Sequence, residues 1–489
     1  MRALQLAAAL TLALWLPATV AGAQTNRDIE LIEAAKKADT AAVRALLKQG
    51  VNVNARYGDG TTALHWAVYR GNREETDLLI RSGASVNAVT DIGVTPLWVA
   101  CANASTALVA RLLEAGADPN ITPPTNGSPL MVASRTGNAE AVRLLIDRHA
   151  NVNAKEAARN QTALMWAVAE RHPDVVRELL AAGADIHARS KTSSRYVLMC
   201  CQDFQGDSDG GGYTEEGGFT PFLFAARVGD IESATRLLAA GANIEDTAPT
   251  GTSALVLAAH SDQGVFATFL LEKGANPDAD EAGYTALHAA IVRGNLNLVK
   301  ALVAHGANPN ARQKEGSPSK RYSGFALDRT MIGATPFLLA TRASQLEAMK
   351  ALAAGGGDVN LTLDDGTTPI MAAARRQGRE GRGLSEDRIV QAMKLAIQLG
   401  SKLNATDQDG NTVLHVAAVR RLDTVVQFLA DSGAPLNAKN LQGQTPLALT
   451  LAPLAPAKGS GEATFNEYNG LKNRTKGTVE LLRKLGATE

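Results

Sequence analysis

The chain has no surplus of charge, few aromatic residues and few cysteines. Its 49 basic residues balance 49 acidic ones, so no positive excess favours a nucleic acid as its partner. Aromatic residues make up 4% of the sequence, whereas alanine and leucine dominate the 45% that is hydrophobic. Both favour helices, and the small alanine side chain lets helices approach one another closely. The composition therefore agrees with a protein of closely packed helices.

Motifs that carry catalysis or bind a cofactor are also absent. The sequence contains no Gly-x-Ser-x-Gly elbow, P-loop, His-Glu-x-x-His pair or dinucleotide fingerprint, so we predict no enzyme activity and no cofactor. Its eight histidines lack the carboxylate or cysteine spacing of a metal site. Of the three cysteines, Cys101 is expected to be a buried thiol. Cys200 and Cys201 are adjacent, and a free pair, an intermolecular bridge and a bond to an outside thiol all remain open for them.

A long apolar run occurs only at the start of the chain. Arg2 precedes apolar residues from Ala3 to Leu16, and Ala21-Gly22-Ala23 provides the small residues of a cleavage site. A run of about 14 residues is shorter than the ~20 that a membrane-spanning helix needs. We therefore predict a signal peptide over residues 1–23, export to the periplasm or the medium, and no membrane insertion of the mature chain.

One motif returns along the rest of the chain. Thr-Ala-Leu-His at Thr62 to His65 opens a stretch that ends in Leu-Leu, Gly-Ala and Asn, and its first position recurs as Thr or Ser. These marks stand at Thr62, Thr95, Ser128, Thr162, Thr220, Ser253, Thr285, Thr335, Thr368, Thr412 and Thr445. Most are 32 to 34 residues apart, and intervals of 58, 50 and 44 residues leave insertions of about 25, 17 and 11 residues.

The period and the motifs resemble those of the ankyrin repeat. Gly-x-Thr-Pro-Leu-x-x-Ala and Leu-Leu-x-x-Gly-Ala-x-x-Asn recur over roughly residues 27 to 489. The resemblance implies an all-α ankyrin-repeat solenoid of about twelve helix-turn-helix units with β-hairpin fingers. Residues 24–489 would then form one array, with residues 27–55 as the N-terminal cap unit and the last unit as the other cap.

A single unit shows how the pattern folds locally. Between Arg56 and Ala88, Thr62 is placed to cap a first short helix, Gly71 helps to end it, and Gly83 ends a second helix. Such a pair cannot bury both of its faces alone, so it stacks on its neighbours. In three units the fourth position of the signature is a histidine, namely His65, His288 and His415. In the family this imidazole forms hydrogen bonds in the turn, so we predict a scaffold role.

Two insertions fall directly before units of the same class. Every third unit has the same kind of signature, which suggests duplication of a three-unit module. We predict that residues 190–217 and 312–332 enlarge two hairpin fingers on the same side of the array, and that residues 378–388 and 453–475 lie between the helices of one unit. Both fingers carry an arginine followed by a tyrosine, residue types that anchor interfaces. These pairs are Arg195 with Tyr196 and Arg321 with Tyr322.

Ankyrin proteins most often bind partners through their fingers and the end of the first helix, seven or eight residues after the Thr mark. Seven of ten complete units carry arginine there, which predicts a basic stripe along a concave groove. The predicted partner-binding residues, besides the finger pairs, are Tyr69, Arg70, Arg135, Arg227, His260, Arg293, Arg342, Arg375, Arg376 and Arg420. Asn103 and Glu170 stand at the same position in two other units.

Two interpretations of the arginines remain open. They bind an acidic or extended protein partner through planar, bidentate contacts, or each pairs with an acid of a finger tip such as Asp59 or Asp365. The resemblance implies a non-catalytic protein-binding module, expected to be a monomer. The alternative is a structural or regulatory envelope protein, such as an inhibitor or stabiliser of an exported enzyme.

Overall fold

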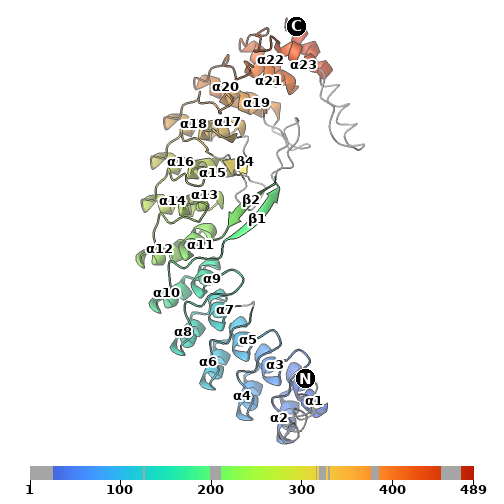
Figure 1. The fold of residues 1–489 in the computed structure, drawn as a ribbon, viewed down its shortest axis with the longest axis vertical. Coiled ribbons are helices and arrows are strands. Elements are labelled where there is room, and N and C mark those ends of the chain that lie inside the picture. The colour runs from blue at the N-terminus through green and yellow to red at the C-terminus, as the bar shows by residue number, and fades with distance from the viewer. Residues whose placement is uncertain are drawn as a thin grey trace, which may run out of the picture. The chain divides into compact units, whose positions relative to one another are not determined.

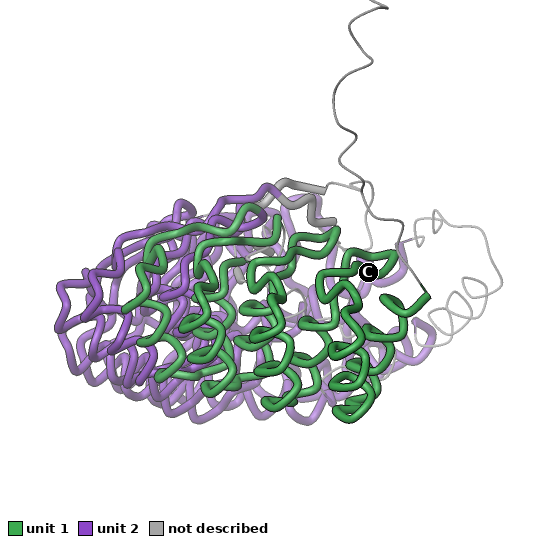
Figure 2. Tube along the Cα trace, turned by 90° about the horizontal axis from the view of Figure 1, so that it is seen from below, with its two compact units in different colours: residues 1–157 green, residues 158–489 purple. Residues whose placement is uncertain are grey.

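A computed structural model of the protein describes residues 26–124, 127–198, 211–314, 317–318, 327–328, 331–375, 385–452 and 475–489. The predicted signal peptide lies outside these residues. The chain divides into two units, Met1–Ala157 and Ala158–Glu489, each of which is described by itself (Figure 2).

The first unit contains four helix pairs (Figure 1). Its described elements are α1 (Asn26–Lys36), α2 (Thr40–Lys48), α3 (Ala63–Tyr69), α4 (Arg73–Arg81), α5 (Pro96–Ala102), α6 (Thr106–Glu114), α7 (Pro129–Arg135) and α8 (Ala139–Asp147). The odd-numbered helix of each pair follows a Thr or Ser mark, except in α1, which begins the cap pair.

The second unit continues the same alternation and adds two hairpins (Figure 1). Its described elements are α9 (Ala163–Ala169), α10 (Pro173–Ala181), β1 (Ser193–Leu198), β2 (Gly211–Glu216), α11 (Pro221–Val228), α12 (Ile231–Ala239), α13 (Ala254–His260), α14 (Gly264–Glu272), α15 (Ala286–Arg293), α16 (Leu296–Ala304), β3 (Ser317–Pro318), β4 (Leu327–Asp328), α17 (Pro336–Arg342), α18 (Leu346–Ala354), α19 (Pro369–Arg375), α20 (Glu386–Gln398), α21 (Val413–Val419), α22 (Asp423–Asp431), α23 (Pro446–Leu451) and a final helix over residues 475–484.

First helices begin at a capping hydroxyl. Thr95 Oγ1 accepts the backbone N–H of Trp98 at 3.1 Å, and Pro96 occupies the first helical position, where it breaks no hydrogen bond. Losing such a cap costs about 1 kcal/mol. Gly83 follows the second helix of the same type of pair with φ 87°, a left-handed conformation that favours glycine.

First helices are buried more completely than second helices. All residues of α13 are buried, whereas α12 buries only Ser233, Ala234 and Leu237. Neighbouring first helices contact each other along the stack, as α11, α13 and α15 do. Each pair thus buries apolar surface against the next pair, which is how a repeat array is stabilised. The predicted all-α solenoid with hairpin fingers is confirmed.

The finger before α11 is a two-stranded antiparallel hairpin. β1 and β2 pair along their whole length, and Ser193 lies opposite Glu216 at the base. Gly217 follows β2 with φ 101°, and a Cβ atom there would lie 2.2 Å from the carbonyl oxygen of Lys191. Only glycine can therefore lead the chain out of the hairpin at this point.

An arginine fastens the base of this hairpin to the array. Arg189 Nη1 donates to the carbonyl oxygens of Gly218 at 2.8 Å and Thr247 at 2.9 Å. The finger that contains β3 and β4 has an equivalent arginine, Arg312, whose Nη1 donates to Gly333 and Thr362. Both hairpins are therefore held to the finger of the next repeat.

The predicted insertions between helices are placed only in part. Helix α20 has 13 residues and begins at Glu386, so the last residues of the segment predicted as 378–388 are helical. Residues 376–384 and 453–474 lie outside the described residues, and α19 and α20 flank the first of these segments.

Candidate functional site

Most predicted recognition residues lie at the ends of first helices. Tyr69, Arg135, His260, Arg293, Arg342 and Arg375 are the last residues of α3, α7, α13, α15, α17 and α19. Arg227 is the penultimate residue of α11, and Arg70, Asn103, Glu170 and Arg420 follow directly as C-caps. The repeat therefore places each of them at one of two adjacent positions, although their environments differ.

The finger residues are described less fully. In the hairpin backbone Arg195 pairs with Thr214, and Tyr196 pairs with Tyr213. Arg321, Tyr322 and Arg376 lie outside the described residues. The role of these five predicted residues in partner binding stays a prediction.

A cavity of about 380 Å³ lies at the base of the β1–β2 hairpin. We call it the hairpin-base cavity. It is lined by residues of the loop before α9, of the hairpin base, and of α11 and α13, namely Ala158, Arg159, Gln161, Ser190, Lys191, Ser193, Glu216, Gly217, Phe219, Phe224, Arg227, Leu257, His260 and Ser261. Two predicted recognition residues, Arg227 and His260, are brought together here, and the lining includes none of the others whose side chains the structure describes.

Backbone hydrogen bonds and an aromatic pair build the cavity. The backbone N–H of Lys191 donates to the carbonyl oxygen of Arg159 at 2.6 Å. The N–H of Phe219 donates to Ser190 Oγ at 3.0 Å, which closes the hairpin against α11. The rings of Phe219 and Phe224 meet edge to face with centroids 5.9 Å apart, and both side chains are buried. The cavity therefore has one apolar wall.

Basic side chains outnumber acidic ones around this cavity. Arg159, Lys191 and Arg227 line it together with a single acid, Glu216. Arg227 is exposed, and no described residue forms a hydrogen bond or ion pair with its guanidinium. A guanidinium in this state can receive a carboxylate through two parallel hydrogen bonds.

His260 lies at the inner side of the cavity and is 5% exposed. Burial, followed by the nearby charge of Arg293, lowers the pKa of its imidazole to about 4. The ring is therefore neutral near pH 7. Because it is buried, His260 offers a partner little surface, and its role in partner binding stays a prediction.

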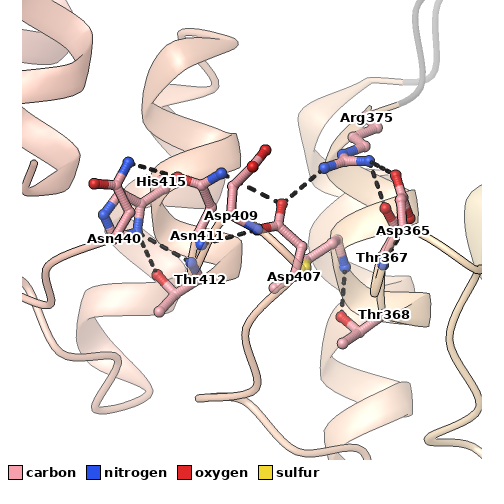
Figure 3. Close-up of polar contacts among 11 residues, drawn as sticks. Asp365, Thr367, Thr368, Arg375, Asp407, Asp409, Asn411, Thr412, His415 and Asn440 are labelled. Atoms are coloured by element: carbon pink, nitrogen blue, oxygen red, sulfur yellow. Dashed lines mark hydrogen bonds and ion pairs between the residues drawn. The ribbon is translucent and has the colours of Figure 1, made fainter. Parts of the chain in front are cut away.

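Arg375, at the equivalent position of a later repeat, is fully engaged (Figure 3). Its Nη1 lies 2.9 Å from Asp365 Oδ2 and also donates to Thr367 Oγ1, and its Nη2 lies 2.9 Å from Asp407 Oδ2. Burial opposes ionisation of Asp365, but the hydrogen bonds from Thr367 and Arg375 outweigh it, so its pKa is lowered. For Arg375 the structure therefore shows the second interpretation, pairing with finger acids.

The carboxylate of Asp407 links this ion pair to the next finger. Its Oδ1 accepts the backbone N–H groups of Asp409 at 3.1 Å and Asn411 at 2.9 Å. Asn440 Nδ2 then donates to Asn411 Oδ1 at 3.0 Å, which extends the network to the following repeat (Figure 3). The Asp407 side chain is 2% exposed, so the centre of this network is buried.

The remaining arginines differ among themselves. Arg135, Arg342 and Arg420 each take part in an interaction, so none of them is free. Arg70 Nε donates to the carbonyl oxygen of Lys36 at 2.8 Å. Among the described residues the predicted stripe is therefore a set of separate environments, and Arg227 lines a cavity.

The three signature histidines hold the scaffold. His288 Nδ1 lies 3.2 Å from the backbone nitrogen of Thr285, and its Nε2 lies 3.1 Å from the carbonyl oxygen of Ala334 in the next unit. A carbonyl can only accept, so Nε2 carries the proton, Nδ1 accepts, and the ring is neutral. Burial lowers the pKa of His288 to about 4 and also lowers the pKa values of His65 and His415.

Several residues of the site were not predicted from the sequence. Arg159 lies in the loop before α9 and Lys191 lies just before β1, where the repeat pattern gives no weight to side chains. The clamping arginines Arg189 and Arg312 had a signal, since both follow an alanine just before an insertion.

The described residues contain no group of three or more His, Cys, Asp or Glu side chains that could hold a metal ion. Burial raises the pKa of the Cys101 thiol well above its ordinary value, so this thiol is unreactive. Cys200 and Cys201 lie outside the described residues. Every helix among the described residues is too short or too polar to cross a bilayer.

Family models of ankyrin repeats match four stretches of the chain. The family description "Ankyrin repeats (3 copies)" matches residues 31–123, 107–190 and 222–313, and "Ankyrin repeats (many copies)" matches residues 397–449. Human ASB11 is similar in structure: its ankyrin repeat domain shares 30% identity with a TM-score of 0.41, over 50% of this chain and 98% of that domain.

Curated relatives match over less than half of the chain. Human palmitoyltransferase ZDHHC13 is 28% identical over 231 residues, 46% of this chain and 33% of that protein. The mouse B-cell lymphoma 3 protein homolog is 30% identical over 220 residues, 44% of this chain and 40% of that protein. Human ankyrin repeat and SOCS box protein 16 is 33% identical over 230 residues, 45% of this chain and 40% of that protein. This chain thus spans two fifths or less of their lengths.

Proposed function

The chain belongs to the ankyrin repeat family, and from this premise we propose that it is a non-catalytic module that binds a protein partner through the hairpin-base cavity. The fold is typical of interaction modules, so the general role comes with the family. The choice of the cavity rests on one observation, the exposed and unpartnered guanidinium of Arg227 within the described residues.

The chemistry of the cavity favours an acidic side chain of the partner. Arg227 can bind a carboxylate in a bidentate manner, while Arg159 and Lys191 add positive charge at the rim. The buried rings of Phe219 and Phe224 give the partner an apolar wall to pack against. A volume of about 380 Å³ is at the small end of binding pockets, so it suits a few side chains of a protein segment.

Reversal of one charge tests this proposal. A partner is first isolated with the mature chain from the exported fraction, and its affinity is then measured for the wild type and for Arg227→Glu. We expect binding to weaken at least about tenfold, because a carboxylate at position 227 would repel the partner's acid. The melting temperature should stay nearly unchanged, since the Arg227 side chain is exposed.

Lys394→Glu is the matched control, because Lys394 is exposed on the second helix α20, away from the cavity. Equal affinities of the wild type and Arg227→Glu would contradict the proposal. Arg342 and Arg293 are left unchanged in this test. Arg342 already has an interaction partner, and the charge of Arg293 lowers the pKa of buried His260, so reversing either charge would also disturb the array itself.

We also propose that the module acts after export, and the support is the sequence of residues 1–23. In that setting the partner would be another exported protein, which the module stabilises or inhibits. Mass spectrometry of the N-terminus in a cell fraction tests the step: a mature chain that begins at Gln24 is expected, and an intact Met1 in the cytosolic fraction would contradict it.

A further inference from the structure

An exposed cluster of aromatic and cationic side chains lies in the first unit, apart from the residues that line the hairpin-base cavity. It consists of Tyr57, Trp66 and Tyr69 with Lys36 and Arg70, and we call it the aromatic cluster. Helices α1 and α3, which contact each other, supply all of it except Tyr57 in the finger before α3 and the C-cap Arg70 (Figure 1).

The members of the cluster are placed by measured contacts. Lys36 Nζ lies 5.3 Å from the centroid of the Trp66 ring and 5.8 Å from that of Tyr57. The rings of Trp66 and Tyr69 meet edge to face at 5.7 Å, and Arg70 Cζ lies 5.9 Å from the Tyr69 centroid. Such distances are within the range of cation–π attraction. The side chains therefore hold one another in place.

The two tyrosine rings are nevertheless open to solvent. Tyr57 is 43% exposed and Tyr69 is 57% exposed, in a chain with few aromatic residues. Cation–π pairs at exposed sites contribute only about 0.5–1 kcal/mol each. This small gain in stability does not explain why two tyrosines lie on the surface. Preordered tyrosine and arginine side chains are the types that contribute most to binding when a partner covers them.

The charges of the cluster define what can bind. Arg70 is anchored by Nε to the carbonyl oxygen of Lys36 at 2.8 Å, and none of the described residues supplies it with a carboxylate. Lys36 has an acid nearby, Glu33, at 3.6 Å. A cationic ligand would meet two positive charges already stacked on the rings, whereas a carboxylate would meet the unused Nη groups of Arg70.

We propose that the aromatic cluster binds an extended segment of a partner protein in which an Asp or Glu lies next to an aromatic or large aliphatic residue. The carboxylate binds Arg70, and the apolar side chain packs on Tyr69 and Tyr57. The aromatic cluster shares no residue with the lining of the hairpin-base cavity. Binding at the cluster can therefore be disproved while binding at the cavity holds, and the reverse is also true.

Short synthetic peptides of equal length test the proposal on the full mature chain. One peptide carries Glu beside Phe, and three others carry Gln beside Phe, Glu beside Ser, or Lys beside Phe. Binding is followed by fluorescence anisotropy of a dye on the peptide. We expect the Glu–Phe peptide to bind at least about tenfold more tightly than each of the others, and more tightly at low salt.

Variants then locate the binding surface. Arg70→Glu should weaken binding of the Glu–Phe peptide at least about tenfold, and Tyr69→Ala should weaken it several-fold. Arg81→Glu, the same charge change at the exposed end of α4, should leave binding unchanged, as should Arg227→Glu. Tighter binding of the Lys–Phe peptide, no binding of any peptide, or wild-type affinity of Arg70→Glu would overturn the proposal.

Discussion

Arg227 and Arg375 stand at the same position of their repeats, seven residues after the marks Thr220 and Thr368. Arg375 is held by two carboxylates, one of them buried. Arg227 has no such partner among the described residues and faces a cavity. Identical placement on the array has produced a structural residue in one repeat and an open one in another.

The neighbouring fingers explain the difference. The acids that bind Arg375 stand three residues before its own mark, at Asp365, and five residues before the next mark, at Asp407. At the same two positions around Arg227 the chain has Gly217 and Ala248. The turns are alike, because the N–H of Gly251 donates to Ala248 as that of Gly410 does to Asp407. Between these two repeats, therefore, the turns agree and the side chains of the finger differ.

Removing the buried acid should have the largest effect. Asp407→Ala leaves the Arg375 guanidinium without its buried partner and two backbone N–H groups without an acceptor. Each backbone N–H group left without an acceptor costs about 1–3 kcal/mol, and Arg375 keeps only Asp365 as an ion-pair partner, so the free energy of unfolding should fall by about 3–5 kcal/mol. Urea unfolding followed by circular dichroism measures it.

Asp409→Ala is the control for this prediction. Asp409 is exposed and contributes a backbone N–H, not a side-chain contact, to the network. Its substitution should change the free energy of unfolding by no more than about 0.5 kcal/mol. A similar loss in both variants would show that the Asp407 carboxylate has no special role.

Lowering the pH should also reduce the free energy of unfolding, because the buried signature histidines are neutral in the folded protein. The effect of each histidine should be smaller than that of Asp407→Ala. The folded pKa of His288 is about 4, below the value of 6.5 for the free side chain, so the unfolded chain takes up the proton first as pH falls. The contribution of neutral His288 to the free energy of unfolding is complete above pH 6.5 and is lost progressively down to pH 4. The difference corresponds to about 3 kcal/mol.

The measurement is the free energy of unfolding between pH 7 and pH 4, for the wild type and for His288→Gln. The variant should show a shallower dependence on pH, because its side chain does not titrate. His305→Gln, at an exposed residue that directly follows α16, is the control for the substitution itself. An equal slope in the wild type and His288→Gln would contradict the assignment of the neutral imidazole.

The sequence predicts the scaffold well, because every repeat restates it. The period identifies the fold, the caps such as Thr95, and the ends of the first helices, and it predicts the role of His288. It does not predict the state of each arginine. Pairing of Arg375 depends on acids in two different fingers, and the cavity at Arg227 depends on where the hairpin base packs. Both result from contacts between repeats, which a pattern within one repeat does not contain.

Converting the open arginine into a paired one is the sharpest test of the comparison, although its effect on stability is the smallest. Ala248→Asp places a carboxylate at the position that Asp407 occupies beside Arg375. If the turns are equivalent, the new acid should pair with Arg227 and interact with it by about 1 kcal/mol. The same variant should weaken binding of a partner at the hairpin-base cavity, because the guanidinium is no longer available.

A double-mutant cycle with Arg227→Ala measures the interaction. Ala248 is 3% exposed, so in the Arg227→Ala background the introduced carboxylate is buried without a cation and should destabilise the protein more than it does alone. Additive effects of the two substitutions would mean that position 248 does not face Arg227. The contrast with Arg375 would then come from the packing of the hairpin and not from the missing acid.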